Sequence, residues 1–247
     1  MHEQVTITTH DGDCPTHVFT PAGSGPWPAV IFYMDGLGIR PTLFSMAQRI
    51  ADHGYLVLLP DLFYRAGPYE PFNAAEIFAS ADRMDKIGPF FATTNPAKAA
   101  GDTEAFLAYL DSRNDIAGKK IGVTGYCMGG GMVLAVAGTY PDRVAAAASF
   151  HGGNLATDAP DSPHLLVSKI KGRVYVAGAD KDDFYPPEMA LRLEKALTEA
   201  GVDHRCEIYP GALHGWTMAD FPIYDEEAAE RHWHELFALF DTTLRPE

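Results

Sequence analysis

Apolar residues along the chain alternate between unbroken runs and helical spacing. The run PAVIFYMD at residues 28–35 is apolar until it turns polar at its end, which is typical of a strand covered on both faces. In residues 41–55, apolar side chains recur every three or four positions, which predicts a helix that ends at His53-Gly54. The alternation continues to the end of the chain. We expect further strands at residues 55–61, 120–126, 144–152, 172–180 and 204–210, and further helices at residues 73–87, 96–111, 130–140, 186–201 and 225–241.

Two short strands precede this alternation. VTITT and THVFTP are joined at Asp11-Gly12, a dipeptide typical of a hairpin turn. The rest of the pattern predicts an α/β fold, with a mostly parallel twisted sheet, helices on both faces and an antiparallel N-terminal edge. Neither a linker nor a repeat interrupts it, so we expect a single domain over residues 1–247. In such sheets the functional groups gather beyond the carboxyl ends of the strands.

Composition narrows the possible partners. The net charge of −14 argues against nucleic acid or an anionic membrane surface, because both need clustered lysine and arginine. Residues 1–25 are polar and lack the apolar core of a signal peptide, so we expect a cytoplasmic protein. The three cysteines, Cys14, Cys127 and Cys206, are odd in number and widely spaced, which indicates neither a disulfide framework nor a metal site.

One of these cysteines lies in a distinctive motif, VTGYCMGGGM at residues 123–132. Residues 125–129 read G-x-C-x-G, the nucleophile-elbow pattern with sulfur in place of oxygen, between a predicted strand and a predicted helix. A helix N-terminus favours a thiolate, so Cys127 is the candidate nucleophile. The alternative is a buried, inert cysteine that acts as a small hydrophobic residue.

A thiol nucleophile needs a base and an orienting carboxylate, which follow it along the chain in enzymes with this elbow. His214 lies after the strand at residues 204–210 and is the expected base, although His151 also follows a strand. Asp180 is the expected acid because it comes first after the strand at residues 172–180, with Asp182 and Asp183 as alternatives.

Acyl transfer also needs hydrogen-bond donors for the oxyanion. The backbone N–H of Met128, directly after the nucleophile, should be one donor, and Gly36 or Leu37 should supply the other. Asp35 precedes these residues at a strand end. Its carboxylate could oppose the thiolate or take the thiol proton, or it could only form the turn before glycine.

The segments YMDGLGIRP, GYLVLLPDLFYR, IGVTGYCMGG, GAD and LHGW resemble the dienelactone hydrolase family of the α/β-hydrolase fold, over about residues 28–216. The resemblance implies hydrolysis of a lactone or related ester by a Cys–His–Asp triad without a cofactor. Carried over by position, Cys127 is the nucleophile, Asp180 the acid and His214 the base. Asp35 falls where the family prototypes have a glutamate that switches the thiol proton, and it is one methylene shorter.

The resemblance is weaker at the substrate-binding positions. Met218 stands where the prototypes place an arginine that pairs with the substrate carboxylate, which favours a less anionic or bulkier ester. Arg83 and Trp216 are further candidates for substrate contact, and Arg40 and Arg65 lie in other loops at strand ends.

Residues 62–95 contain many aromatic, glycine and proline residues, and we expect them either to cap the pocket or to pack as ordinary helices. A small-molecule substrate and a monomer or homodimer are expected. One rival interpretation is a redox protein, which the absence of a C-x-x-C pair disfavours. The other is a non-catalytic binding protein that shares the fold.

Overall fold

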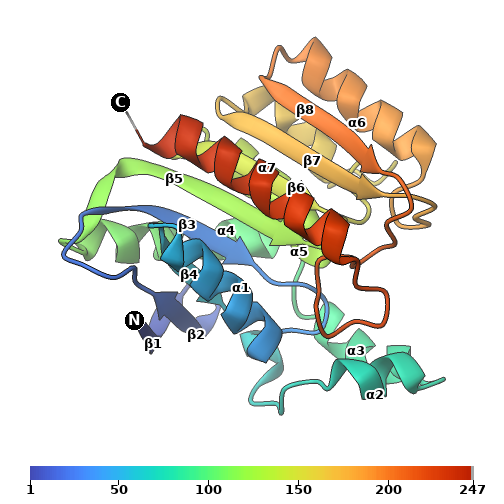
Figure 1. Cartoon of the computed structure of the whole chain (residues 1–247), viewed down its shortest axis with the longest axis horizontal. Coiled ribbons are helices and arrows are strands. Elements are labelled where there is room, and N and C mark those ends of the chain that lie inside the picture. The colour runs from blue at the N-terminus through green and yellow to red at the C-terminus, as the bar shows by residue number, and fades with distance from the viewer. Residues whose placement is uncertain (246–247) are drawn as a thin grey trace.

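The computed structural model describes residues 1–245, which form an eight-stranded mixed sheet with helices on both faces (Figure 1). The strand order across the sheet is β1-β2-β4-β3-β5-β6-β7-β8. Strand β2 pairs antiparallel with β1 and β4, whereas all pairs from β4 to β8 are parallel. The predicted α/β fold class and its antiparallel N-terminal edge are therefore confirmed.

The strands have these bounds: β1 (His2–Thr9), β2 (Gly12–Phe19), β3 (Trp27–Tyr33), β4 (Leu56–Pro60), β5 (Ile116–Tyr126), β6 (Val144–Phe150), β7 (Arg173–Ala179) and β8 (His204–Tyr209). The α-helices are α1 (Pro41–Asp52), α2 (Ala74–Ala79), α3 (Arg83–Phe91), α4 (Pro96–Ser112), α5 (Met128–Thr139), α6 (Pro187–Glu199) and α7 (Glu226–Leu244). Two 3₁₀ helices, η1 (Tyr64–Ala66) and η2 (Pro163–Lys169), complete the described structure.

Helices α1 and α7 lie in front of the sheet in Figure 1, and α4 and α5 lie behind it. Helix α5 is buried along its whole length from Gly129 to Gly138, which explains why its sequence has no polar face. One continuous cluster of buried apolar residues reaches from Ile7 to Leu244. This continuity supports the proposal of a single domain, whose expected end at residue 247 lies outside the described residues.

The helix expected at residues 73–87 is instead two helices, α2 and α3. Asn73 caps α2, because its side chain accepts a hydrogen bond from the N–H of Glu76. Ser80 ends α2 in an extended conformation (φ −85°, ψ 129°), and its hydroxyl hydrogen-bonds to Asp82. Short polar side chains that compete for hydrogen bonds therefore interrupt a helix that apolar spacing alone predicts as continuous.

The parallel strands end at a common edge. Tyr33 at the end of β3 pairs with Gly125 of β5, and Tyr126 pairs with Phe150 of β6. On the other side, the last residue of β7 pairs with the last residue of β8. All the candidate functional residues that follow these strands are consequently delivered to the same side of the molecule.

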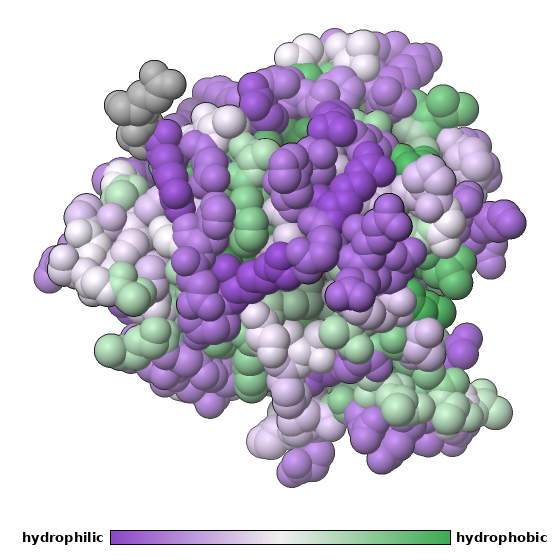
Figure 2. All heavy atoms as spheres, viewed as in Figure 1, coloured by the Kyte–Doolittle hydropathy of each residue, from purple (hydrophilic) through white to green (hydrophobic). Residues whose placement is uncertain are grey.

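Residues 62–95, which include α2 and α3, form a small layer over this edge. Four buried residues, Leu37, Ala74, Ile77 and Ile87, make a cluster separate from the main core. Phe221, from the segment between β8 and α7, packs against the same cluster. On the face seen in Figure 2, hydrophobic residues gather over α2 and α3, while hydrophilic residues dominate over α7.

Candidate active site

Cys127 occupies a strained turn between the last residue of β5 and the first residue of α5. Its φ of 54° and ψ of −113° lie outside the regions that residues with a side chain normally adopt. The thiol is half-buried at the N-terminus of α5, where unpaired N–H groups favour negative charge. This strand–turn–helix geometry is the one that the G-x-C-x-G motif predicts.

Two glycines make the turn possible. A Cβ on Gly125 would lie 2.2 Å from the carbonyl oxygen of Gly129, and a Cβ on Gly129 would lie 2.3 Å from the carbonyl oxygen of Tyr33. A side chain at either position would therefore collide with backbone. Gly131 is different, because the nearest atom to its Cβ would be 3.5 Å away, an ordinary contact.

His214 follows β8 and forms a short hydrogen bond with a buried carboxylate. Its Nδ1 lies 2.7 Å from Oδ2 of Asp182, whose side chain is fully buried. Oδ1 of Asp182 accepts a second hydrogen bond, from the N–H of Phe184 at 2.8 Å. Because both oxygens are engaged, the carboxylate is fixed in the orientation that holds Nδ1–H of the imidazole.

The structure places Asp180 elsewhere. Its Oδ2 accepts from the N–H of Gly211 at 3.1 Å, and its own N–H donates to the carbonyl of Ala212. Lys181 then adopts a φ of 55°, and this left-handed turn brings Asp182 to His214. The partner of His214 is thus Asp182, not the expected Asp180; Asp183 is exposed.

The environment of His214 favours the imidazolium form. Burial lowers the pKa of His214, but the hydrogen bond with Asp182 and the charges of Asp182 and Cys127 outweigh burial and raise it to about 10. Nε2 of His214 is buried, and no atom of residues 1–245 lies in hydrogen-bonding geometry with it, so Cys127 acts on the ring from nearby without a formed bond. The side of the ring opposite Asp182 is therefore available to the thiol.

The candidate oxyanion donors lie at two neighbouring strand ends. Met128 is the first residue of α5, and the β3 end that precedes Gly36 touches the elbow at Gly129. The N–H of Leu37 already donates to Oδ1 of Asp35 at 3.0 Å, so of the two expected second donors Gly36 stays the candidate. A Cβ on Gly36 would lie 2.7 Å from the Phe91 ring, so the layer over the sheet edge packs directly on this loop.

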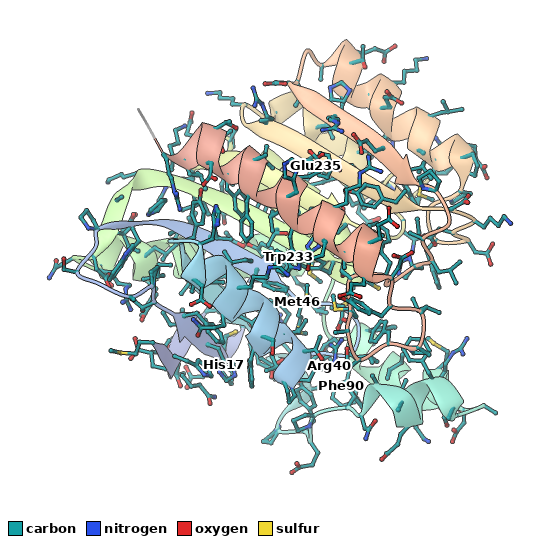
Figure 3. All side chains as sticks on the ribbon, in the orientation of Figure 1. His17, Arg40, Met46, Phe90, Trp233 and Glu235 are labelled. Carbon is teal, nitrogen blue, oxygen red and sulfur yellow. The ribbon has the colours of Figure 1, made fainter. Side chains whose placement is uncertain are left out.

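Asp35 is held by Arg40 in a buried ion pair. Nη1 and Nη2 of Arg40 donate to the two carboxylate oxygens at 2.6 Å and 2.8 Å. The exposed fractions of the two side chains are 2% for Arg40 and 1% for Asp35. Nε of Arg40 also donates to Asp220 at 2.7 Å, in the segment after His214. Figure 3 shows Arg40 at the start of α1, on the side of α2 and α3. Both oxygens of Asp35 therefore have donors other than a thiol, which differs from the expected proton switch.

Two of the three expected substrate-binding residues are shielded from solvent. Met218 and Trp216 are fully buried, so a substrate would reach them only after a rearrangement. Arg83 is exposed at the start of α3. Two exposed side chains near His214 are apolar: Phe184 is 55% exposed with its ring centroid 5.0 Å from that of His214, and Leu213 is 46% exposed.

Two polar residues, Arg40 and His151, make contacts at the site that the sequence did not indicate. In the sequence, Arg40 stands out only as an arginine in a loop, and His151 only as a histidine at a strand end. The short spacing of Asp35 and Arg40 is the one sequence feature that could have indicated their ion pair. No sequence pattern links Arg40 to Asp220, or His151 to the elbow. Within residues 1–245, no three metal-binding side chains gather at one place, and no helix has the length and apolar character to cross a bilayer.

Comparisons with known proteins identify the family and agree with the fold. The profile of the dienelactone hydrolase family matches residues 14–244. A "Putative carboxymethylenebutenolidase" from Synechocystis sp. is 28% identical over 246 residues, covering 98% of this chain and 96% of the relative. The crystal structure of a "Putative Dienelactone Hydrolase" from Klebsiella pneumoniae superposes with a TM-score of 0.83 at 21% identity, covering 97% and 98% of the two chains. A dienelactone hydrolase-like promiscuous phosphotriesterase from metagenomic libraries superposes with a TM-score of 0.75 at 23% identity, covering 98% of both chains.

Proposed function

Because this chain belongs to the dienelactone hydrolase family, we propose that it hydrolyses a small ester or lactone through a thioacyl intermediate on Cys127. The observation that carries the proposal is the buried Asp182–His214 hydrogen bond of 2.7 Å, with Nε2 of His214 left to the thiol. A non-catalytic binding protein would have no need for an oriented imidazole beside a strained cysteine. The geometry therefore favours an enzyme.

In the first step, the Cys127 thiolate attacks the carbonyl carbon of the substrate. The N–H groups of Met128 and Gly36 stabilise the oxyanion. The carbon–oxygen bond to the leaving group then breaks, and the alkoxide takes the proton from Nε2 of His214. The products of this step are a free alcohol, a thioester on Cys127 and a neutral imidazole.

The second step uses the change in charge at the thiol. Once Cys127 is acylated, it no longer contributes the negative charge that helps to raise the pKa of His214. The neutral imidazole can therefore accept a proton from water, which attacks the thioester. The carbon–sulfur bond breaks, the acid leaves, and the thiolate and imidazolium are restored.

The ion pair at Asp35 bears on which group exchanges the thiol proton. An unpaired carboxylate next to the elbow would oppose a thiolate, but Arg40 neutralises Asp35. His214, with its raised pKa, supplies the compensating positive charge. We therefore propose that Asp35 shapes the oxyanion loop and that His214, not Asp35, exchanges the proton with the thiol.

The substrate is proposed to lack a carboxylate near the scissile bond. Arg40 is already bound by two carboxylates, and Met218 stands where the family prototypes have arginine. The exposed Phe184 and Leu213 offer apolar contact next to His214. A matched pair of substrates, p-nitrophenyl butyrate and p-nitrophenyl hemisuccinate, tests this, and we expect the uncharged ester to have the higher kcat/KM.

The main test replaces Cys127 with alanine and measures hydrolysis of p-nitrophenyl acetate. We expect turnover to vanish, and we expect mass spectrometry of the quenched wild-type enzyme to find one acetyl group on Cys127. Cys206→Ala is the matched control, because Cys206 is a half-buried thiol in β8 whose pKa burial raises to about 12. Undiminished turnover by Cys127→Ala would refute the proposed nucleophile.

A further inference from the structure

His151 is a fully buried histidine that the proposed triad does not use. It directly follows β6, and its φ of 38° makes it a second strained residue beside the elbow. Its backbone N–H donates to the carbonyl of Ala177 in β7 at 2.8 Å. This hydrogen bond to β7 fixes the main chain of His151, and its backbone conformation sets the direction of the His151 side chain.

The imidazole of His151 connects the elbow to the loop that carries the base. Its Nδ1 accepts a hydrogen bond from the backbone N–H of Cys127 at 3.1 Å, a donor shared with the carbonyl of Phe150. Its Nε2 lies 2.7 Å from Oγ1 of Thr217, three residues after His214. The rings of His151 and His214 meet edge to face, with centroids 5.4 Å apart.

These contacts determine the tautomer. Because Nδ1 accepts the Cys127 N–H, the ring proton is on Nε2, and Nε2–H donates to Thr217. Burial, followed by the charges of His214 and His232, lowers the pKa of His151 well below its usual range. A neutral ring can remain next to the imidazolium of His214 without repelling it, whereas a second charged imidazole in this site could not.

We propose that His151 is a positioning residue that fixes the distance between the Cys127 thiol and His214 by bridging the elbow to Thr217. This role rests on the proposed thiol chemistry. A packing role alone would need only the volume of the ring, because the Cys127 N–H retains the Phe150 carbonyl as an acceptor when His151 is removed. The bridge instead needs an acceptor at the Nδ1 position and a donor to the hydroxyl of Thr217.

The test uses side chains that keep or remove each half of the bridge. Asn at position 151 places an amide oxygen near the Nδ1 position, whereas Leu keeps only apolar volume; Thr217→Ser keeps the hydroxyl, whereas Thr217→Val removes it. For each variant, we measure the rate of iodoacetamide alkylation of Cys127 at pH 7.5, kcat and KM for p-nitrophenyl acetate, and Tm. The alkylation assay needs no knowledge of the natural substrate.

We expect His151→Leu to lower kcat and the alkylation rate by up to about 100-fold with little change in KM, the loss that a misplacement of ~1 Å can cause. His151→Asn keeps the acceptor for the Cys127 N–H but does not reach Thr217, and Thr217→Val removes the hydroxyl, so each breaks one half of the bridge and should show part of this loss. Thr217→Ser should behave like the wild type. If His151→Leu does not fold, the comparison of Thr217→Val with Thr217→Ser tests the bridge on its own.

Two outcomes would overturn the inference separately from the proposed function. If wild-type Cys127 is reactive and folded His151→Leu and Thr217→Val keep that reactivity and kcat, His151 only fills space. If His151→Asn lowers the alkylation rate and kcat as much as His151→Leu does, an acceptor for the Cys127 N–H contributes nothing and the bridge is refuted. If wild-type Cys127 reacts no faster than a peptide thiol and Cys127→Ala keeps esterase activity, the proposed function fails and this inference with it.

Discussion

The buried ion pair between Arg40 and Asp35 leads to a prediction about stability that can be worked from the structure. Arg40→Met keeps most of the side-chain volume but leaves Asp35, which is 1% exposed, without its charged partner. Loss of one partner of a buried pair destabilises a protein by about 3–5 kcal/mol, because water cannot solvate the remaining charge. Asp220 is 28% exposed, so water can solvate its carboxylate, and the loss of its contact with Arg40 should add little to this destabilisation.

The assay is urea unfolding at pH 7, followed by circular dichroism and linear extrapolation. We expect the free energy of unfolding of Arg40→Met to fall by about 3–5 kcal/mol, and that of Asp220→Asn, the control, by less than about 1 kcal/mol. The double variant Arg40→Met/Asp35→Asn should recover part of the loss because no buried charge remains.

The same substitution should slow alkylation of Cys127, because an unneutralised carboxylate then lies on the loop that packs against the elbow. A loss of stability below about 1 kcal/mol for Arg40→Met, with an unchanged m-value, would contradict the buried-charge argument. Unchanged alkylation in a folded Arg40→Met would contradict the proposal that Arg40 keeps the charge of Asp35 from opposing the thiolate.

Three other predictions test the site. Asp182→Asn should lower kcat for p-nitrophenyl acetate by roughly two to four orders of magnitude, because the imidazole loses its orienting carboxylate, whereas Asp180→Asn should retain most activity. Because the pKa of His214 is raised to about 10, its contribution to stability is complete below its usual pKa of 6.5 and is lost as pH rises toward 10. The wild type should therefore lose more free energy of unfolding between pH 7 and pH 10 than His214→Gln does. Gly125→Ala should destabilise the fold by about 3 kcal/mol or more, since its Cβ meets backbone, while Gly131→Ala should be neutral or stabilising by up to about 1 kcal/mol.

Each of these predictions has a result that would contradict it. Equal kinetic losses in the two aspartate variants would argue against Asp182 as the orienting acid. Parallel pH–stability curves for the wild type and His214→Gln would show that the imidazolium contributes nothing to folding. A Gly125→Ala variant as stable as Gly131→Ala would mean that the elbow can move to admit a side chain.

The sequence predicted the sheet and the elbow because both depend on local patterns. Buried parallel strands are continuously apolar, and the G-x-C-x-G motif places small residues where Gly125 and Gly129 meet backbone. The order of strands in the sheet then brings Cys127 and His214 to one edge. These features need no knowledge of how distant side chains pair.

The choice among the aspartates depended on a single backbone angle. Asp180, Asp182 and Asp183 lie within four residues, and the left-handed φ of Lys181 selects Asp182. Lysine gives no indication of such a turn, because this conformation is usually taken by glycine or asparagine.

The pairing of Arg40 with Asp35 and Asp220 could not be predicted from the sequence for another reason. The second contact joins residues 180 positions apart, and it forms only when the loops after β3 and β8 meet. The same holds for His151 and Thr217, which are separated by 66 positions.

The contacts of Gly129 have a consequence for how this chain can diverge. The atoms that its absent Cβ would meet first are the carbonyl oxygens of Tyr33 and Met34, so the nucleophile is located by main chain and not by neighbouring side chains. Substitutions along β3 that preserve the strand leave those oxygens in place. The side chains of the core, and with them the stability of the protein, can therefore change during evolution without moving the Cys127 thiol from the end of β5.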